Sequence, residues 1–381
     1  MPLPDSKHRL TVVQVLPALE SGGVERGTLE VGKYLVEHGH RSIVISAGGR
    51  LVEQLEQEGS EHFTWEVGRK SPYTLLRYVG RLRRFLRDEN VDILHVRSRM
   101  PAWVGYLAWR GMDPKRRPRF VTTVHGLYSV NNYSAVMVKG ERVIAVSSTV
   151  LNYIRNNYPK VAPGSIVVIN RGVDPAEFSP DFRPSTAWLA DWRREYPDLQ
   201  SGRILLLPGR ITRLKGHEDF LRLIADLRSC GLPVRGLIVG GAAPGKQAYL
   251  DELRHLTHNL GLDAAITFTG QRGDLREIMA VSDIVLSLSS KPESFGRTVL
   301  EAYSLGIPVI GYAHGGVGEQ LEALLPEGCI APGDLLALAD RIKQWLDTPP
   351  RMTKQHAFTL NNMLQGTLAL YAQLANKPES E

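Results

Sequence analysis

The chain has 381 residues, which is too long for one ordinary hydrophobic core and suits two domains of common size. It is 43% apolar and 23% charged, as in a globular protein, and its two cysteines lack the spacing of a disulfide scaffold or a structural zinc site. This cysteine usage predicts a reducing, cytoplasmic compartment. The run Thr11–Leu16 is too short for a signal peptide, and no later run approaches the roughly 18 apolar residues of a membrane span.

Charge is distributed unevenly along the chain. Residues 1–185 carry 26 Lys and Arg against 18 Asp and Glu, whereas the remainder carries 20 against 22. The basic half predicts an anionic partner, such as anionic lipid or a phosphorylated glycan, although a surface kept charged for solubility explains the same count. We expect no nucleic acid as a partner, because charge alone suggests it and no recognisable nucleic-acid module occurs.

The first half alternates short apolar, β-branched runs with segments of helical period. Helical segments such as Glu25–Glu37 and Pro72–Arg87 lie between most of the runs. Runs that are apolar on both faces and separated by helices predict a parallel sheet covered on both sides. The predicted strands are Thr11–Leu16, Arg41–Ser46, Val91–Val96, Phe120–Val124, Arg142–Val146 and Ser165–Ile169.

The same pattern restarts after a proline-containing stretch. That stretch, Asp174–Gln200, is the expected interdomain linker, with helix-forming residues near Ala187–Arg194, and a long helix, His356–Ala375, closes the chain. We therefore expect an α/β protein of two doubly wound, Rossmann-like domains, residues 1–185 and 186–355. The second series of strands is Arg203–Leu207, Val234–Val239, Ala265–Thr269, Asp283–Leu288 and Pro308–Gly311.

In such folds, ligands bind beyond the carboxyl ends of the strands, and two domains predict a large site in the cleft between them. Gly22 and Gly23 follow the first strand and open a helix, where bare N–H groups can bind an anion. A flexible turn explains these glycines as well. His125, which is followed by Gly126, ends the strand Phe120–Val124 and is placed for a cleft, although a histidine of the core or surface fits the same pattern.

A basic loop follows the strand Arg203–Leu207. It contains Gly209, Arg210, Lys215 and Gly216 just before a helix, and both cationic side chains suit phosphate oxygens. Such a loop can neutralise a diphosphate without a metal ion, although solvated basic residues are the alternative. Since no Asp-x-Asp and no His-rich metal spacing occur, we expect no metal site.

Two glutamates, Glu293 and Glu301, flank a turn after the strand Asp283–Leu288. Pro292 and Gly296 predict a fixed turn, a helix is expected to begin near Arg297, and Gly306-Ile307-Pro308 ends it. Glu301 then lies about one turn into the helix, and both carboxylates face one cleft. A solvent-exposed helical Glu301 is the alternative, which its apolar neighbours disfavour.

Taken in order with their strand contexts, five motifs resemble the retaining nucleotide-sugar glycosyltransferases of family 4, which have the GT-B fold. The resemblance covers about Val12 to Tyr371. Asn-Arg-Gly-Val-Asp departs from the commoner Asn-Gly-Val-Asp, so no role is carried onto Arg171. The motifs are GGVE at Gly22–Glu25, HG at His125–Gly126, NRGVD at Asn170–Asp174, GRITRLKG at Gly209–Gly216 and ESFGRTVLE at Glu293–Glu301.

The resemblance implies roles for these residues. Glu293 and the backbone of Ser294, Phe295 and Gly296 would bind the donor sugar, and Glu301 would bind the ribose. Arg210 and Lys215 would hold the diphosphate, helped by Gly22, Gly23 and the N–H groups near Thr298 and Val299. His125 would lie beside the reacting bond, Arg272 would touch the base, and the last helix, 356–376, would return to the first domain. The catalytic residues would thus be His125, Glu293, Arg210 and Lys215, without metal or other cofactor.

The implied reaction is retaining transfer of a hexose or N-acetylhexosamine from a nucleoside diphosphate sugar, most commonly linked to uridine. The Phe-Gly-Arg-Thr-Val-Leu-Glu-Ala variant at Phe295–Ala302 resembles transferases of the lipopolysaccharide core, so a lipid-linked or core glycan is the expected acceptor. An exopolysaccharide or capsule transferase and a non-catalytic nucleotide-sugar-binding protein of the same fold are the alternatives. An epimerase shares the two-domain plan; a phosphorylase would need a pyridoxal lysine context that is not found.

The basic half also contains two candidate membrane segments. Arginines recur along the predicted helix Pro72–Arg87, and the apolar, aromatic stretch Ala102–Trp109 precedes a basic run from Lys115. Cationic residues beside aromatic ones suit an anionic membrane surface, so peripheral attachment to the inner face of the cytoplasmic membrane is one interpretation. Apolar residues in the core with arginines on a solvated face are the other.

Overall fold

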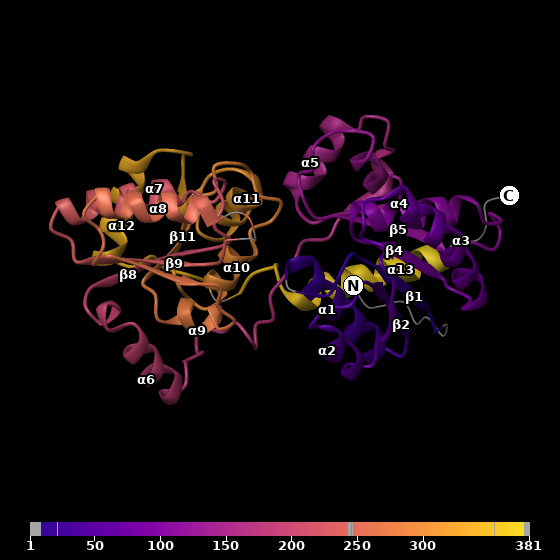
Figure 1. The fold of residues 1–381 in the computed structure, drawn as a ribbon, viewed down its shortest axis with the longest axis horizontal. Coiled ribbons are helices and arrows are strands. Elements are labelled where there is room, and N and C mark those ends of the chain that lie inside the picture. Colours follow the sequence, from indigo (N-terminus) through magenta and orange to yellow (C-terminus); the bar gives the residue numbers. More distant parts are fainter. Residues whose placement is uncertain (1–8, 21, 243–244, 246, 354, 377–381) are drawn as a thin grey trace. The chain divides into compact units, whose positions relative to one another are not determined.

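A computed structural model of the chain describes residues 9–20, 22–242, 245, 247–353 and 355–376. It divides into two compact units, of which the first comprises the chain up to Arg171 together with the segment from Asn361, and the second comprises Gly172–Leu360 (Figure 1). The start of the expected first domain, residues 1–8, lies outside the described residues. Each unit is built on one parallel sheet, which confirms the expected class of two Rossmann-like domains.

The first unit contains a seven-stranded sheet in the order β3-β2-β1-β4-β5-β6-β7, and its described pairings are all parallel. Its central strands are fully buried because their Val, Ile and Leu side chains are covered from both faces. The strands are β1 (Thr11–Val15), β2 (Arg41–Ser46), β3 (Glu61–Thr64), β4 (Ile93–Val96), β5 (Arg119–Val124), β6 (Arg142–Ala145) and β7 (Ile166–Val168).

Helices connect these strands. Helix α3 illustrates the local rules, because Ser71 caps its first turn by accepting a hydrogen bond from Tyr73 N–H and Pro72 occupies the first helical position. The helices are α1 (Gly23–Glu37), α2 (Val52–Gln57), α3 (Pro72–Asp88), α4 (Arg99–Arg110), α5 (Ser148–Asn157) and α13 (Leu360–Ala375), with 3-10 turns η1 (Ser134–Val138) and η2 (Pro163–Ser165).

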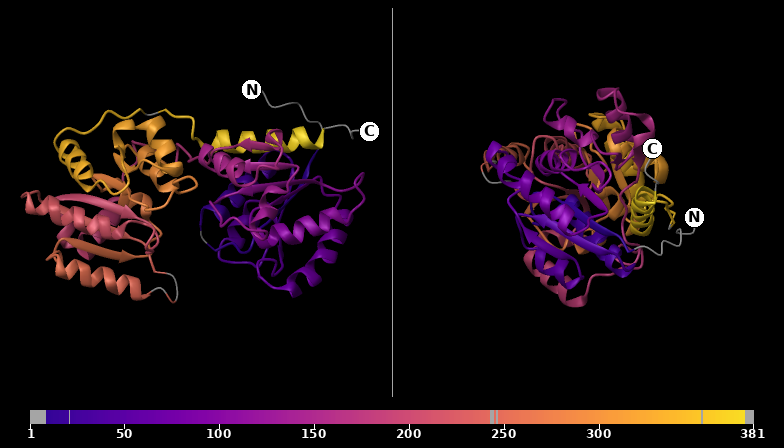
Figure 2. Two further views of the ribbon diagram at one scale, coloured as in Figure 1. Left: turned by 90° about the horizontal axis from the view of Figure 1, so that it is seen from above. Right: turned by 90° about the vertical axis from the view of Figure 1, so that its right-hand side faces the viewer.

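The last helix, α13, returns to the first unit, as expected. Both views of Figure 2 show it in yellow against the indigo and purple elements of that unit. The buried Tyr371 hydroxyl lies 2.5 Å from His95 Nδ1 on β4, and His95 Nε2 lies 2.6 Å from Thr123 Oγ1 on β5. The C-terminal helix is therefore hydrogen-bonded into the centre of the first sheet.

The second unit contains a six-stranded parallel sheet in the order β10-β9-β8-β11-β12-β13. Its strands are β8 (Arg203–Pro208), β9 (Val234–Val239), β10 (Ile266–Gly270), β11 (Ile284–Ser287), β12 (Val309–Tyr312) and β13 (Cys329–Ile330). Its helices are α6 (Thr186–Glu195), α7 (His217–Ser229), α8 (Gln247–Asn259), α9 (Leu275–Ala280), α10 (Arg297–Ser304), α11 (Gly315–Leu324) and α12 (Leu335–Asp347), with turns η3 (Pro197–Gln200) and η4 (Pro326–Gly328).

The boundary between the units lies at Arg171 and Gly172, earlier than the expected position after residue 185. Val173 pairs with the returning chain, since its N–H donates to Phe358 O and its carbonyl accepts from Leu360 N–H. The expected linker also contains α6, whose Trp188 indole donates to Asp274 at 2.8 Å. These hydrogen bonds bind the segment to the second unit, whereas its prolines indicated an interdomain linker, and α6 confirms the helix expected near Ala187–Arg194.

A close backbone contact joins the loops that follow β8 and β11. Gly216 has a φ of +73°, and a Cβ atom there would lie 2.0 Å from the carbonyl oxygen of Leu288. Ser290 N–H donates to Leu214 O across the same contact, at 2.9 Å. Only glycine permits both the left-handed backbone and this approach, and the contact brings the loop containing Lys215 to the end of β11.

We therefore expect Gly216→Ala to destabilise the second unit by about 3 kcal/mol, because left-handed strain and overlap with Leu288 act together. Gly231 is the matched control, because its φ is +82° but no described atom lies within 4 Å of a built Cβ. Gly231→Ala should cost only the strain, about 1 kcal/mol. Denaturant unfolding of both variants measures the difference, and equal losses would contradict the contact.

Candidate active site

The loops after β8 and β11 bring Lys215 and Glu293 together. Lys215 Nζ lies 2.7 Å from Glu293 Oε1, and the same oxygen accepts a hydrogen bond from the Ser289 hydroxyl. Both side chains of the ion pair are about three-quarters buried. Two residues 78 positions apart in the sequence thus form one charged group at the carboxyl edge of the second sheet.

The turn that holds Glu293 is fixed by helix α11. Gly316 N–H donates to Glu293 O at 2.7 Å, and the Gln320 side-chain amide donates to Phe295 O. A Cβ atom at Gly315 would lie 2.7 Å from the backbone nitrogen and oxygen of Glu293, so a glycine is needed for this approach. The carboxylate is therefore held in place before any ligand binds.

Glu293 is ionised at neutral pH. Burial alone would raise the pKa of its carboxyl group, but the charge of Lys215 and hydrogen bonds from Lys215 and Ser289 outweigh burial, so the pKa lies below its ordinary value. His314, whose Nε2 lies 2.7 Å from Ser289 O, adds a smaller effect in the same direction. The carboxylate can accept hydrogen bonds from hydroxyl groups but cannot donate a proton to a leaving group.

Helix α10 begins at Arg297 and buries Glu301, as the sequence predicts. Glu301 is 7% exposed and accepts a hydrogen bond from Arg297 Nε at 2.8 Å. Gly296 precedes the helix with a φ of +88°, and the N–H of Val299 donates to Gly296 O at 3.1 Å. The other expected donor-binding residues of this segment lie in the turn before α10 or in its first turn, namely Ser294, Phe295 and Thr298.

Two arginines of the second unit differ in their surroundings. Arg210 follows β8 directly and its side chain is exposed. Arg272 is hydrogen-bonded to Asp274 and Glu195, at distances from 2.9 to 3.1 Å. Those carboxylates raise its pKa and connect α6 to the start of α9. Arg272 therefore has a structural partner on each side in the position where we expected contact with a nucleotide base.

In the first unit, helix α1 begins at Gly23, two residues before the expected start at Glu25, and Gly22 is its N-cap. Both glycines are exposed, and the Arg26 N–H donates to Gly22 O at 3.0 Å. The carboxylate of Glu25 lies over this end, since a Cβ atom at Gly22 would be 2.7 Å from its Oε2. An acidic side chain thus lies at the helix N-terminus where the sequence predicts an anion.

His125 follows β5 and is hydrogen-bonded to Arg171. Arg171 donates from one terminal nitrogen to His125 Nδ1 at 2.8 Å and from the other to Gly23 O at 2.7 Å. Because a guanidinium group only donates, His125 Nδ1 accepts and its ring proton is on Nε2. Burial and the charges of Arg171 and Arg97 lower the pKa of His125 well below its ordinary value, so the ring is neutral.

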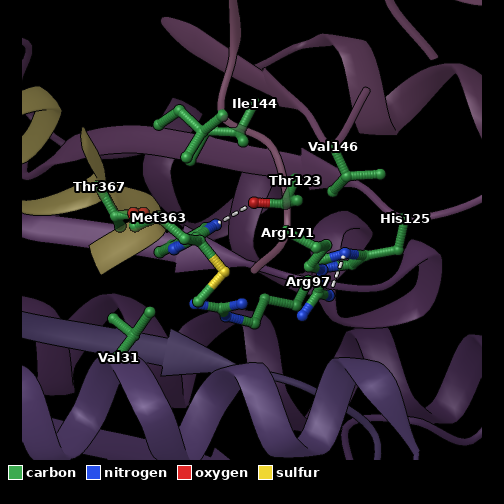
Figure 3. Close-up of a pocket in the computed structure, with 11 residues that line it drawn as sticks. Val31, Arg97, Thr123, His125, Ile144, Val146, Arg171, Met363 and Thr367 are labelled. Carbon is green, nitrogen blue, oxygen red and sulfur yellow. Dashed lines mark hydrogen bonds between the residues drawn. The ribbon is translucent and has the colours of Figure 1, made fainter. Parts of the chain in front are cut away.

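A pocket beside His125 lies at the carboxyl ends of the first sheet (Figure 3). It is lined by Arg97, after β4, by Arg171, after β7, and by Met363 and Thr367 of α13. The sequence motifs assign no role to either arginine. Arg171 departs from the commoner form of its motif, although both arginines obey the rule that functional residues follow strand ends.

Within the described residues, no group of three or more His, Cys, Asp or Glu is arranged to hold a metal ion. In the same part of the chain, no helix is long and apolar enough to cross a membrane.

Comparisons with known proteins agree with this fold. The model of Glycosyltransferase Family 4 matches residues 21–177, and that of Glycosyl transferases group 1 matches residues 190–361. The N-acetyl-alpha-D-glucosaminyl L-malate synthase of Bacillus anthracis is 28% identical over 348 residues, which are 87% of this chain and 85% of that protein. The fold and its strand-end loops thus define a sugar transferase.

Similar solved structures identify the family of transferases to which the chain belongs. A glycosyltransferase from Rickettsia africae is 33% identical with a TM-score of 0.85, over 97% of this chain and all of that one. Anabaena HepE in complex with UDP and glucose has a TM-score of 0.81 at 20% identity, over 96% of this chain and 100% of that one. The chain belongs to the family 4 glycosyltransferases, which have the GT-B fold.

The fully buried His217, two residues after Lys215, predicts a pH dependence of stability. Burial lowers its pKa from 6.5 to about 4. Between pH 6.5 and about 4, the His217 side chain is therefore protonated in the unfolded chain but not in the folded chain. The free energy of unfolding, which is at its full value above pH 6.5, decreases as the pH falls toward 4. Between pH 7 and 4.5 we expect His217 to account for a loss of about 2–3 kcal/mol.

Urea unfolding at both pH values measures this loss. His217→Gln should reduce the difference between the two pH values, whereas His255→Gln, at an exposed position of α8, should leave it unchanged. The same pH dependence in wild type and His217→Gln would show that other groups cause the loss.

Proposed function

We propose that the protein transfers a hexose or N-acetylhexosamine, with retention, from a nucleoside diphosphate sugar to a hydroxyl group of an anionic acceptor. The observation that carries this proposal is the buried Lys215–Glu293 ion pair at the carboxyl edge of the second sheet. It presents a fixed carboxylate for sugar hydroxyls beside a fixed cation for phosphate. Membership of the glycosyltransferase family supports the transferase class.

The donor is bound by the second unit in this proposal. Glu293 accepts hydrogen bonds from the sugar, and Lys215 retains N–H donors for the diphosphate because an ammonium group has three and Glu293 engages one. The exposed Arg210 adds a planar pair of donors. Glu301, buried in the first turns of α10, accepts from the ribose.

In this proposal, fixed positive charges accelerate the reaction by stabilising the leaving group. The nucleoside diphosphate departs with growing negative charge, and fixed cations stabilise that charge most in the transition state. Because Arg210 and Lys215 supply the positive charge, we propose that no metal ion is needed. Neutral His125 is a hydrogen-bond donor through Nε2 and belongs beside the reacting bond.

Retention has a specific route in this proposal. The acceptor hydroxyl attacks the face that the leaving group vacates, and an oxygen of the departing phosphate takes its proton. The ionised Glu293 accepts hydrogen bonds and forms no covalent intermediate.

The donor base and the acceptor are narrower proposals. Uridine is proposed as the base because it is the commonest in the family resemblance and because HepE, which shares the fold, binds UDP. A lipid-linked or lipopolysaccharide core glycan is the acceptor that the sequence motif favours. The Bacillus anthracis relative instead joins its sugar to L-malate, so a small anionic acceptor is the second candidate, ahead of a capsule glycan or a non-catalytic role.

Turnover should depend on the donor-binding residues. In a panel of nucleoside diphosphate sugars, we expect Glu293→Ala, Arg210→Ala and Lys215→Ala each to lower release of the nucleoside diphosphate by about 100-fold or more. EDTA should leave the wild-type rate unchanged.

Arg213→Ala is the matched control for the cations. Arg213 lies in the same loop as Arg210 and Lys215, but it is exposed and paired with Glu252, so its loss should preserve turnover. Unchanged turnover in all three site variants would refute the assignment, and loss of turnover in Arg213→Ala would show that the loop as a whole is responsible.

Peripheral membrane attachment is a further part of the proposal, and it concerns the first turns of α3. Tyr73 is 62% exposed and Leu76 84%, beside Arg77, which donates to the Tyr73 hydroxyl. Lys70 lies 4.7 Å from the ring of Tyr133. By contrast, most of the other expected segment, Ala102–Trp109, is buried in the core. The interpretation therefore applies to α3 alone, at the inner face of the cytoplasmic membrane.

Anionic vesicles at low salt should bind the wild-type protein and release it as salt rises. Leu76→Glu should weaken this binding by about tenfold, because it removes an exposed apolar contact and adds a repelled charge. Leu336→Glu, an equally exposed leucine on α12, should leave it unchanged. Absence of vesicle binding by the wild type would rule out the membrane part of the proposal.

A further inference from the structure

The pocket beside His125 contains a buried cation with an unused donor. Arg97 is only 4% exposed, and its Nε is buried without a hydrogen-bond partner. The side chain of Arg97 is hydrogen-bonded to Tyr371, and Glu30 attracts its charge. A buried N–H group without a partner costs free energy, and this one belongs to a side chain that lines the pocket (Figure 3).

A second guanidinium group lines the same pocket in a fixed position. Arg171 is held at both ends, by the carbonyl of Gly23 and by the ring of His125. These contacts fix the orientation of the guanidinium group, which keeps its positive charge at any physiological pH. Arg97 and Arg171 come from the ends of two different strands, so the fold itself brings the two charges to one pocket.

The described residues that line the pocket include no acidic side chain. Both lining histidines are kept neutral, since burial and the positive charge of Arg97 and Arg171 lower the pKa values of His95 and His125. Part of the remaining lining is apolar, such as Val31 and Ile144. Two like charges against an apolar wall repel each other more strongly than in water, and an anion between them offsets that cost.

We propose that this pocket binds the anionic group, a carboxylate or a phosphate monoester, of the acceptor, with Arg97 and Arg171 as its charged contacts. Identification of this ligand as the acceptor rests on the proposed transfer reaction, whereas the binding of an anion by Arg97 and Arg171 does not depend on that reaction. The acceptor is assigned here because the cations proposed for the donor diphosphate, Arg210 and Lys215, belong to the second unit. A molecule with an anionic group and a hydroxyl near it fits a pocket that His125 also lines.

Calorimetric titration with inorganic phosphate and with malonate tests the site directly. We expect Arg97→Gln and Arg171→Gln each to weaken binding at least tenfold, and Arg110→Gln, which removes an exposed arginine at the end of α4, to leave it unchanged. Thermal unfolding confirms that each variant is folded. If Arg97→Gln does not fold, Arg171→Gln and Arg171→Lys, the latter keeping the charge and most of the affinity, decide the outcome. Equal affinities in wild type and Arg171→Gln would overturn the proposal.

A second titration, with saturating UDP, separates the sources of the anion. Phosphate binding that persists in UDP supports an acceptor site, whereas displacement by UDP would assign the pocket to the donor diphosphate and overturn the proposal. In transfer assays with the preferred sugar nucleotide, Arg171→Gln should raise the KM of a phosphorylated acceptor more than that of its unphosphorylated analogue. A wild-type protein that binds phosphate at Arg171 but neither binds nor turns over sugar nucleotides would refute the proposed function while leaving the anion site intact.

Discussion

The contact between the loop of Gly216 and the end of β11 is the constraint on which the second unit's chemistry depends. Without a side chain at Gly216, the backbone approaches Leu288, and Lys215 comes within hydrogen-bonding distance of Glu293. Gly315 and Gly316 of α11 also pack closely against the backbone of Glu293 and Phe295, and so fix the turn that contains Glu293. The ion pair is thus set by backbone packing, and its two side chains need little adjustment when a ligand arrives.

The two units distribute charge differently. In the second, a cation and a carboxylate neutralise each other, and Glu293 remains ionised because Lys215 is near. In the first, two guanidinium groups share a pocket with neutral histidines. The carboxylate whose charge acts on Arg97 is that of Glu30 on α1. A sugar nucleotide contains both polar hydroxyls and a diphosphate, which suits the mixed site, whereas a surplus of positive charge suits a compact anion.

Much of the fold follows from sequence pattern, because buried parallel strands need continuous apolar residues and their helices need an apolar face. Strands β2 and β9 have the predicted bounds, and the turn before Arg297 follows from Pro292 and Gly296. Strand β3 was missed because Glu61–Thr64 is a polar edge segment that is only partly buried, and β13 because it contains two residues.

The sequence names candidate site residues by type, but it does not reveal the contacts between them. The rule that ligands bind at strand ends selects Glu293, Lys215 and His125, but their partners depend on which strands are neighbours. Arg97 obeys the same rule, yet in the sequence it is one of many arginines in the basic half. Its burial follows from the return of α13, which no local pattern reveals.

The return of α13 also bears on the order in which the protein is made. Tyr371, which is hydrogen-bonded to His95 in the middle of the first sheet, leaves the ribosome after the whole second unit has been synthesised. Domains generally fold as they emerge, but here the first unit lacks a central part of its core until α13 has been synthesised. The second unit, whose residues are contiguous, can be complete first, so nascent chains spend much of their synthesis with an unfinished N-terminal core.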